Sequence, residues 1–419
     1  MPNVPYLHKP SLAKSRQPMG FLSHAIRPVD EIIAQPILPK GQKEIQLYDE
    51  KTIDHLSWPQ GEEGDYAKRF LLPLIKRGVH TYIDNIQTDM RILKYGDIIL
   101  PITINDAQYE NSYVCSPYSY YISYAMQSLG VIKIPLGRKV IKGVLASIAK
   151  VFQLCKINKV VIVNNWLFST NLYPSLDSES VSCIKAFLSK HFPDHAIVFK
   201  SIDNQTNPEL FAALKKTRFS MVACRQIFLT DTTKPAIFET RLFKSDLRLL
   251  KASGYEVSCA SQLSQEEQQR LLDLYKDLYI KKYSTLNPNL NLQFVKLAID
   301  QKLLNFKVLK KDGEIDGVVG YILRNGFAMA PFFGYDRAKP KQIGLYRMLS
   351  TVLMLEAKEH QALFHQSSGA SMYKKIRKAN DSIEYMAVYH KHLSVVRKIP
   401  WLLLRSLYNT LGIRFMQRY

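Results

Sequence analysis

The order of strand-like and helix-like segments between residues 305 and 390 limits the fold of this chain more than any other feature of its sequence. The segments run strand, strand, strand, helix, strand, helix and strand, at residues 306–309, 317–323, 327–333, 345–353, 362–366, 371–378 and 383–389. Asp312-Gly313 and Asn325-Gly326 separate the first three strands, and both pairs are typical of two-residue β-hairpins. Three antiparallel strands followed by alternating helices and strands indicate a mixed α/β sheet.

A basic turn with one glycine, Ala338–Tyr346, joins the third strand to the long helix. The helix has apolar residues at positions i, i+3, i+4, i+7 and i+8 from Leu345, so one of its faces is predicted to be buried. Its N-terminus presents unpaired N–H groups and the positive end of the helix dipole, and four lysines and arginines surround it. The turn therefore predicts a phosphate site, and an ordinary connection with solvated lysines is the alternative.

The element order and the turn resemble the coenzyme A-binding half of the GNAT acyltransferase fold, in which a pyrophosphate-binding turn opens the long helix. That family's turn runs Gln/Arg-x-x-Gly-x-Gly/Ala, and the aligned residues are Lys341-Gln342-Ile343-Gly344-Leu345-Tyr346, which keep only the middle glycine. The chain is thereby similar to the divergent double-GNAT branch, which includes Fem-type aminoacyl transferases and polysaccharide-associated acetyltransferases. Gly369–Lys375 is similar to the segment of that branch in which an aromatic residue precedes lysine among small residues.

We predict an α/β (α+β) protein with two GNAT-like halves, each a mixed twisted sheet flanked by helices. The predicted boundaries are residues 1–90 for an irregular N-terminal extension, 91–235 for a degenerate first half, 236–396 for the half that binds the acyl donor, and 397–419 for a basic amphipathic C-terminal helix. A chain of 419 residues is long enough for two or three domains.

Local signals support both halves. Strands are predicted at residues 159–166, 195–201 and 221–229, a helix at 208–216, and a hairpin at 91–104. Asp177 is a candidate N-cap for a further helix, and Ser264–Glu267 predicts a capping box. Residues 230–261 form either a linker or an exchanged connection between the halves.

The resemblance implies direct acyl transfer, in which a bound amine or hydroxyl attacks the carbonyl of the donor. Backbone N–H groups at a splayed central strand, near Phe332–Tyr335, would hold the oxyanion, and a side chain would return a proton to the leaving group. Tyr373 is the candidate acid, and His365 and Glu384 are candidate bases. A packing or structural role is the alternative for each of them.

The resemblance also implies acyl-CoA as the donor, without a metal ion. The candidate donor-binding residues are Phe333, Arg337, Lys339, Lys341, Gln342, Ile343, Gly344, Leu345, Tyr346 and Lys374. Two alternatives stay open: aminoacyl transfer from aminoacyl-tRNA, and a non-catalytic GNAT scaffold that docks on a membrane or a polyanion.

The tyrosine-rich stretch Tyr109–Tyr121 could form either the wall of a ligand-binding site or the edge of the hydrophobic core. The candidate substrate-binding residues are Asn105, Asn111, Tyr113, Cys115 and Tyr283. Cys115 would be a nucleophile only beside a base and a positive charge, and a small buried residue is the alternative. The five cysteines lack the spacing of metal ligands, which fits a reducing cytoplasm.

The chain has a formal net charge of +21, so we expect a polyanionic or membrane partner. Trp401–Met416 is apolar, aromatic and flanked by basic residues, but it is too short and too interrupted to span a bilayer. It is expected either to lie at an anionic membrane surface or to dock on the core of the protein. tRNA is an alternative partner, and no motif for specific DNA binding accompanies the charge. The expected location is the cytoplasm, with peripheral contact at the inner face of the membrane.

Overall fold

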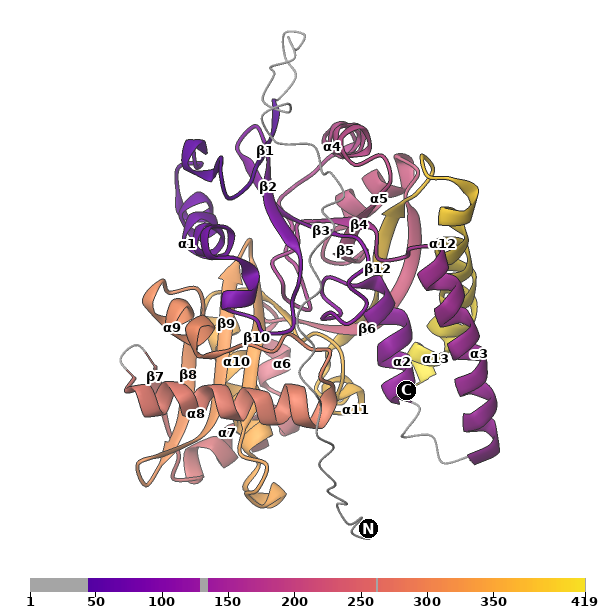
Figure 1. Cartoon of the computed structure of the whole chain (residues 1–419). Helices are drawn as coiled ribbons and strands as arrows, with labels where there is room; N and C mark the ends of the chain where they lie inside the picture. Colours follow the sequence, from indigo (N-terminus) through magenta and orange to yellow (C-terminus); the bar gives the residue numbers. More distant parts are fainter. Residues whose placement is uncertain (1–43, 129–134, 261–262, 419) are drawn as a thin grey trace, which may run out of the picture. The chain divides into compact units, whose positions relative to one another are not determined.

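The computed structural model describes residues 44–128, 135–260 and 263–418, all of them within one compact unit (Figure 1). Predictions for residues 1–43 and for Tyr419 lie outside the described residues. The described chain contains a twelve-stranded mixed sheet covered by helices, which confirms the predicted α/β class. Among the described helices, none has the length and apolar character needed to cross a membrane.

The first half of the sheet and its helices extend from residue 45 to residue 231. Its elements are β1 (Ile45–Tyr48), η2 (Ile53–His55), α1 (Glu62–Arg77), η3 (Val79–Thr81), β2 (Asp89–Tyr95), β3 (Ile98–Asn105), η4 (Ser119–Ser123), α2 (Tyr124–Ser128), α3 (Pro135–Leu154), β4 (Val160–Val163), α4 (Ser178–His191), β5 (Ala196–Ile202), α5 (Pro208–Lys216) and β6 (Ser220–Asp231). Asp177 is the N-cap of α4, since its carboxylate accepts the Ser180 N–H at 2.8 Å. The helix α1 was not predicted and lies in the segment expected to be an irregular extension.

The second half contains all seven predicted segments in the predicted order. Its elements are α6 (Pro235–Phe238), α7 (Arg241–Ala252), β7 (Glu256–Cys259), α8 (Gln265–Lys276), η6 (Asp277–Tyr283), α9 (Leu292–Asp300), β8 (Asn305–Lys311), β9 (Glu314–Arg324), β10 (Phe327–Tyr335), η7 (Lys341–Ile343), α10 (Leu345–Glu359), β11 (Leu363–His365), α11 (Ser371–Lys375), β12 (Asn380–Tyr389), α12 (Val395–Leu407), η8 (Tyr408–Gly412) and α13 (Ile413–Arg418). Both residues of each hairpin pair, Asp312-Gly313 and Asn325-Gly326, have positive φ angles, which matches a type I′ turn. Ser264 and Glu267 form the predicted capping box at the start of α8.

The two halves exchange their last strands. The strand order is β1-β2-β3-β4-β5-β12-β6-β11-β10-β9-β8-β7. Each half supplies five strands that end in a parallel pair, β4 with β5 and β10 with β11. The next strand comes from the other half in both cases, because β12 pairs with β5 and β6 pairs with β11. Of the two alternatives for residues 230–261, the structure therefore has the exchanged connection.

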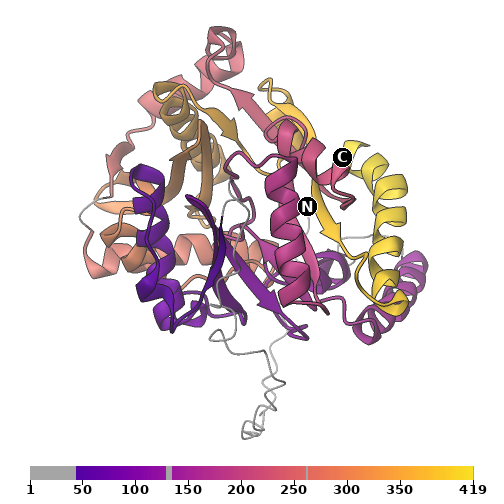
Figure 2. The same ribbon diagram turned by 90° about the horizontal axis from the view of Figure 1, so that it is seen from above.

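Helices lie on both faces of the sheet (Figure 2). Ile184 of α4 packs against one side of the first half, and Trp401 of α12 packs on its other side. Met348 of α10 and Phe294 of α9 belong to the two corresponding clusters of the second half. Phe70 of α1 joins the cluster that contains Phe294, so this helix helps to hold the two halves together.

Candidate active site between the two halves

A cavity of about 490 Å³ lies where the two halves meet. Seven predicted site residues line it: Tyr113, Tyr283, Phe333, Tyr346, His365, Tyr373 and Lys374. Apolar walls with a few convergent polar groups are typical of a substrate site. Among residues 44–128, 135–260 and 263–418, no group of three or more His, Cys, Asp or Glu side chains could hold a metal ion.

The cavity begins where β10 and β11 separate. Their parallel pairing ends at Met329 and His365, after three residue pairs. On its other side, β10 pairs with β9, and this ladder shifts register between Met329 and Phe332. Ala330 and Pro331 fall within the shift and line the cavity. The strand therefore opens earlier than the predicted Phe332–Tyr335, because a proline inside a strand removes a ladder donor and favours a bulge.

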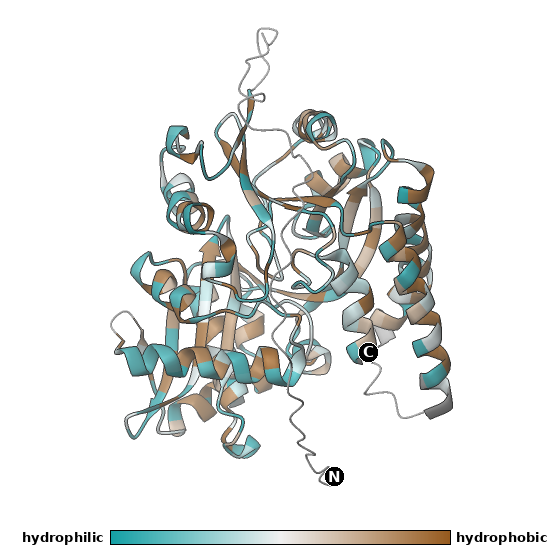
Figure 3. Cartoon of the chain, viewed as in Figure 1, coloured by the Kyte–Doolittle hydropathy of each residue, from teal (hydrophilic) through white to brown (hydrophobic). Residues whose placement is uncertain are grey.

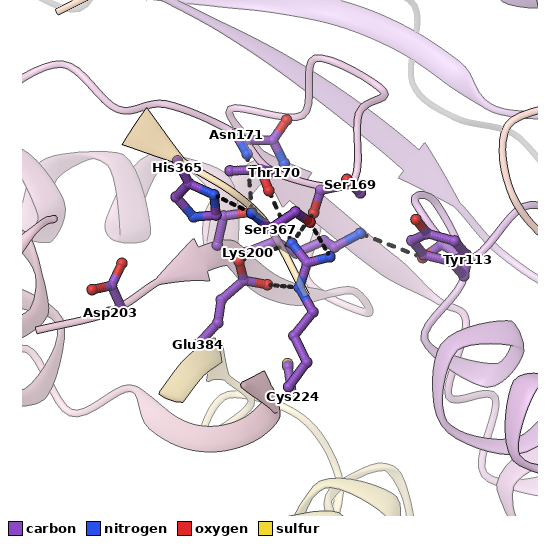
Figure 4. Close-up of polar contacts among 12 residues, drawn as sticks. Tyr113, Ser169, Thr170, Asn171, Lys200, Asp203, Cys224, His365, Ser367 and Glu384 are labelled. Carbon is purple, nitrogen blue, oxygen red and sulfur yellow. Dashed lines mark hydrogen bonds and ion pairs between the residues drawn. The ribbon is translucent and has the colours of Figure 1, made fainter. Parts of the chain in front are cut away.

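Arg225 of β6 is the centre of a polar network in the wall of the cavity. Figure 4 labels its partners Glu384, Thr170 and Ser367. Its Nε and Nη2 donate to the two carboxylate oxygens of Glu384 at 2.9 and 3.0 Å. Nη2 also donates to the Ser169 carbonyl and to Thr170 Oγ1, and Nη1 donates to Ser367 Oγ at 3.2 Å. A bidentate arginine–carboxylate pair fixes both groups in one plane. Glu384, a predicted base, is thus engaged as the partner of Arg225 and is not among the cavity-lining residues of the described chain.

Lys374 of α11 is a buried cation in the cavity wall, with only 5 % of its surface exposed. Its Nζ donates to the carbonyl oxygens of Gln366, Ser367 and Ser368 at 2.6, 3.4 and 3.0 Å. Burial, and then the charge of Arg225, lower the pKa of Lys374 to about 7. The side chain therefore changes its charge near neutral pH.

His365 lies at the end of β11 and also lines the cavity. Burial, helped by Arg225 and Lys374, lowers the pKa of His365 to about 3, so the ring is neutral. The Ser367 N–H donates to Nδ1 at 3.1 Å, which assigns the ring proton to Nε2. In this state His365 is a weak base and a hydrogen-bond donor.

Tyr373 of α11 packs between two neighbouring side chains of the cavity wall. The Arg377 guanidinium lies 3.6 Å from its ring centroid, and the Tyr346 ring lies 5.0 Å away, centroid to centroid. Burial raises the pKa of Tyr373 to about 12, so the phenol keeps its proton at neutral pH. Asp246 of α7 accepts from Arg347 of α10 and from Arg377, which follows α11, each at 2.7 Å. These bonds link α7, α10 and the end of α11.

The predicted donor turn lies at the N-terminus of α10, as expected, but α7 covers its glycine. Gly344 has a φ of 79°, and a Cβ there would lie 2.7 Å from Cδ2 of Leu249. Leu345 is buried in the apolar core of the second half, and Ile343 packs against that core. Gln342 is exposed.

Three basic donor-site candidates lie in the turn or just before it, and two of them are paired with carboxylates. Arg337 lies 3.2 Å from Asp277, and Lys339 lies 3.2 Å from the buried Asp316. Lys341 is exposed and forms no ion pair with any described residue. Of the predicted turn residues, only Tyr346 reaches the cavity described above.

Three predicted substrate-binding residues have structural roles instead of lining the cavity. The side-chain amides of Asn105 and Asn111 both donate to the Gln87 carbonyl, at 2.8 and 2.7 Å. Cys115 is fully buried and accepts from Asn165 at 3.7 Å. Burial raises the pKa of the Cys115 thiol to about 12, so a thiolate at neutral pH is not favoured.

Arg225 was not among the predicted site residues. It lies in the strand predicted at residues 221–229, and its partner Glu384 lies in the strand predicted at 383–389. The position of Arg225 as the one charged residue of an apolar strand could have indicated a buried ion pair, since buried charges are normally paired. Their pairing depends on the strand exchange, which places Arg225 directly opposite Glu384.

No protein-family model and no curated protein matches this chain. Several solved structures are similar in fold. L-PGS from Bacillus licheniformis shares 18% identity, over 58% of this chain and 82% of its own, with a TM-score of 0.43. FemX shares 10% identity, over 54% and 79%, with a TM-score of 0.42. A tandem GNAT protein from the clavulanic acid biosynthesis pathway shares 8% identity, over 83% and 98%, with a TM-score of 0.37. The sheet of this chain has the two halves that the predicted double-GNAT fold requires, with a parallel pair closing each run of five strands.

Proposed function

We propose that this protein transfers an acyl group from a thioester donor to an amine or hydroxyl acceptor in the cavity between its halves. The opening between β10 and β11 is the observation that supports this proposal most directly. Beside it, the register shift between β9 and β10 takes Ala330 out of the hydrogen-bond ladder at the cavity wall. In acyl transfer, negative charge develops on the carbonyl oxygen, and N–H groups or cations fixed nearby stabilise it. We assign this role to the Ala330 N–H, as a hydrogen-bond donor, and to the Lys374 ammonium, through its positive charge, since its own N–H groups donate to three carbonyl oxygens.

The residues of the cavity wall can supply and recover the proton that this reaction needs. The acceptor nitrogen or oxygen attacks the donor carbonyl carbon, and the carbon–sulfur bond breaks as the new bond forms. Tyr373 gives its proton to the departing thiolate and recovers one from the acceptor, so no net proton is consumed. Its raised pKa supports the first step, because the phenol is protonated before the reaction.

One observation favours a second donor class, an aminoacyl ester on tRNA. Leu249 covers Gly344, and both Arg337 and Lys339 are paired with carboxylates. The turn therefore has fewer accessible N–H groups and unpaired positive charges with which to bind a pyrophosphate group. The net charge of +21 would attract RNA as readily as a nucleotide. Lys341 at the N-terminus of α10 remains available for a phosphate of either donor.

Calorimetric titration with acetyl-CoA, a long-chain acyl-CoA, free coenzyme A and an aminoacyl-tRNA tests the donor. Transfer is then measured as donor consumption with a panel of amines and alcohols. Lys374→Met is expected to lower the rate at least about tenfold, as loss of an oxyanion-stabilising group does. Lys375→Met, at an exposed position of the same helix, should leave the rate unchanged.

The outcomes separate the two donors. Thioester binding that Lys341→Glu abolishes would support the coenzyme A donor. Binding of aminoacyl-tRNA alone, weakening steeply with salt, would overturn the thioester donor and support the second class. Failure to bind or consume any of these donors would overturn acyl transfer itself.

A further inference from the structure

The helices α3, α12 and α13, with the turn η8, carry most of the exposed large apolar side chains. They hold thirteen of the nineteen such side chains among the described residues. The most exposed of them are Leu154 at 79%, Val395 at 77%, Phe415 at 66% and Leu411 at 64%. Single exposed apolar residues are common on soluble proteins, but a concentration of this kind marks an interaction surface.

The two main helices of this group lie side by side, as Figures 1 and 2 both show. Phe152 of α3 and Trp401 and Leu404 of α12 are buried in the same apolar cluster on the sheet. The C-terminal helix therefore docks on the core with one face, which was one of the two predicted alternatives. Its other face carries Val395, Ile399 and Leu402, which follow a spacing of i, i+4 and i+7 and stay exposed.

The same segments are uniformly basic. The helix α3 contains four lysines and arginines, residues 395–418 contain five, and neither segment contains an aspartate or glutamate. Figure 3 shows hydrophobic and hydrophilic residues alternating along these helices. An apolar stripe beside basic side chains is the composition of a helix that lies at an anionic lipid interface.

We propose that α3, α12 and α13 form one docking surface for membranes that contain anionic phospholipids. The apolar side chains would enter the acyl-chain boundary, and exposed basic side chains such as Lys142, Lys150 and Arg405 would contact the lipid phosphates. A second copy of this chain is a poorer occupant, because a symmetric contact would bring like-charged surfaces together. The surface joins residues about 250 positions apart in sequence, so it exists only in the folded protein.

The docking surface also continues into the wall of the cavity. Tyr408 of η8 follows α12 and lines the cavity, and Tyr124 of α2, before α3 in the chain, lines it as well. Docking through these helices would place that wall close to the lipid surface.

Vesicle sedimentation with the full chain tests the proposal. Vesicles of phosphatidylcholine with about 30% phosphatidylglycerol are compared with pure phosphatidylcholine, at about 0.1 M and about 0.5 M NaCl. The variants are Val396→Asp/Leu402→Asp, Lys398→Gln/Arg405→Gln and the control Val257→Asp, a valine of β7 that is 38% exposed. Circular dichroism confirms that each variant is folded, and light scattering reports its oligomeric state.

We expect the wild type and the control to bind the anionic vesicles at least about tenfold more tightly than the neutral ones. The aspartate variant should lose at least about tenfold in affinity, and the glutamine variant should lose most of its preference for anionic lipid. Equal binding by folded wild type and aspartate variant, or no vesicle binding at all, would overturn the proposal. So would a wild-type dimer that the aspartate substitutions dissociate, since a second copy would then cover this surface.

Discussion

Replacement of Lys374 by methionine is expected to change how the stability of this protein depends on pH. The ordinary lysine pKa of 10.5 applies in the unfolded chain, whereas burial lowers it to about 7 in the folded protein. Between these values the unfolded state binds more protons, so the wild type becomes more stable as the pH rises. Between pH 7 and pH 9 this difference in proton binding raises the free energy of unfolding by about 2 kcal/mol. A methionine does not titrate, so Lys374→Met lacks this rise.

Urea unfolding at pH 7 and pH 9, followed by circular dichroism, measures this difference. The free energy of unfolding of the wild type, relative to Lys374→Met, should rise by about 2 kcal/mol between the two pH values. The pKa of Lys200 is also lowered, to about 8, but its contribution is the same in both proteins and cancels. Lys375→Met, which removes an exposed lysine, should follow the wild type. A difference between wild type and Lys374→Met that stays constant with pH would contradict the lowered pKa of Lys374, and would mean that the three carbonyl oxygens keep its ammonium charged.

Other side chains give independent tests. Cys115, with its pKa raised to about 12, should resist alkylation in the folded protein while the exposed Cys259 reacts, as peptide mass spectrometry would show. Gly344→Ala should lower the free energy of unfolding by at least about 1 kcal/mol, because of its positive φ and its contact with Leu249. Adding Leu249→Ala should relieve only the clash between the new Cβ and Leu249. Full recovery of the free energy of unfolding would contradict a cost from the positive φ. Arg225→Met leaves a buried carboxylate unpaired and should cost about 3–5 kcal/mol in urea unfolding, and a cost near zero would contradict the pairing.

Local features of the second half could be predicted because they depend on neighbours in sequence. The Asp312-Gly313 and Asn325-Gly326 turns need left-handed backbone angles that asparagine, aspartate and glycine adopt most easily. The capping box at Ser264 needs only residues three positions apart. The periodicity of α10 likewise predicts its buried face, which contains Met348 and Leu349.

The candidate site was only partly predictable for the same reason. Tyr373, Lys374 and His365 lie close together in sequence, and all three line the cavity. The bulge that opens β10 comes earlier than expected, and the proline at position 331 was the signal that could have located it. Leu249 over Gly344 could not be predicted, because it comes from a helix about ninety-five residues earlier, whose packing depends on the whole fold.

Sequence patterns alone predicted the order of the seven segments between residues 305 and 390, the caps at Asp177 and Ser264, the two hairpin turns, the excess of positive charge and the apolar character of the C-terminal helix. Only the tertiary structure decided that the halves exchange their last strands, that Arg225 faces Glu384 across 159 positions of sequence, and that α3 lies beside α12. The first group depends on conformational preferences and contacts within a few residues, which any short segment expresses. The second group depends on which distant surfaces bury each other, and that choice is made by the packing of the whole chain.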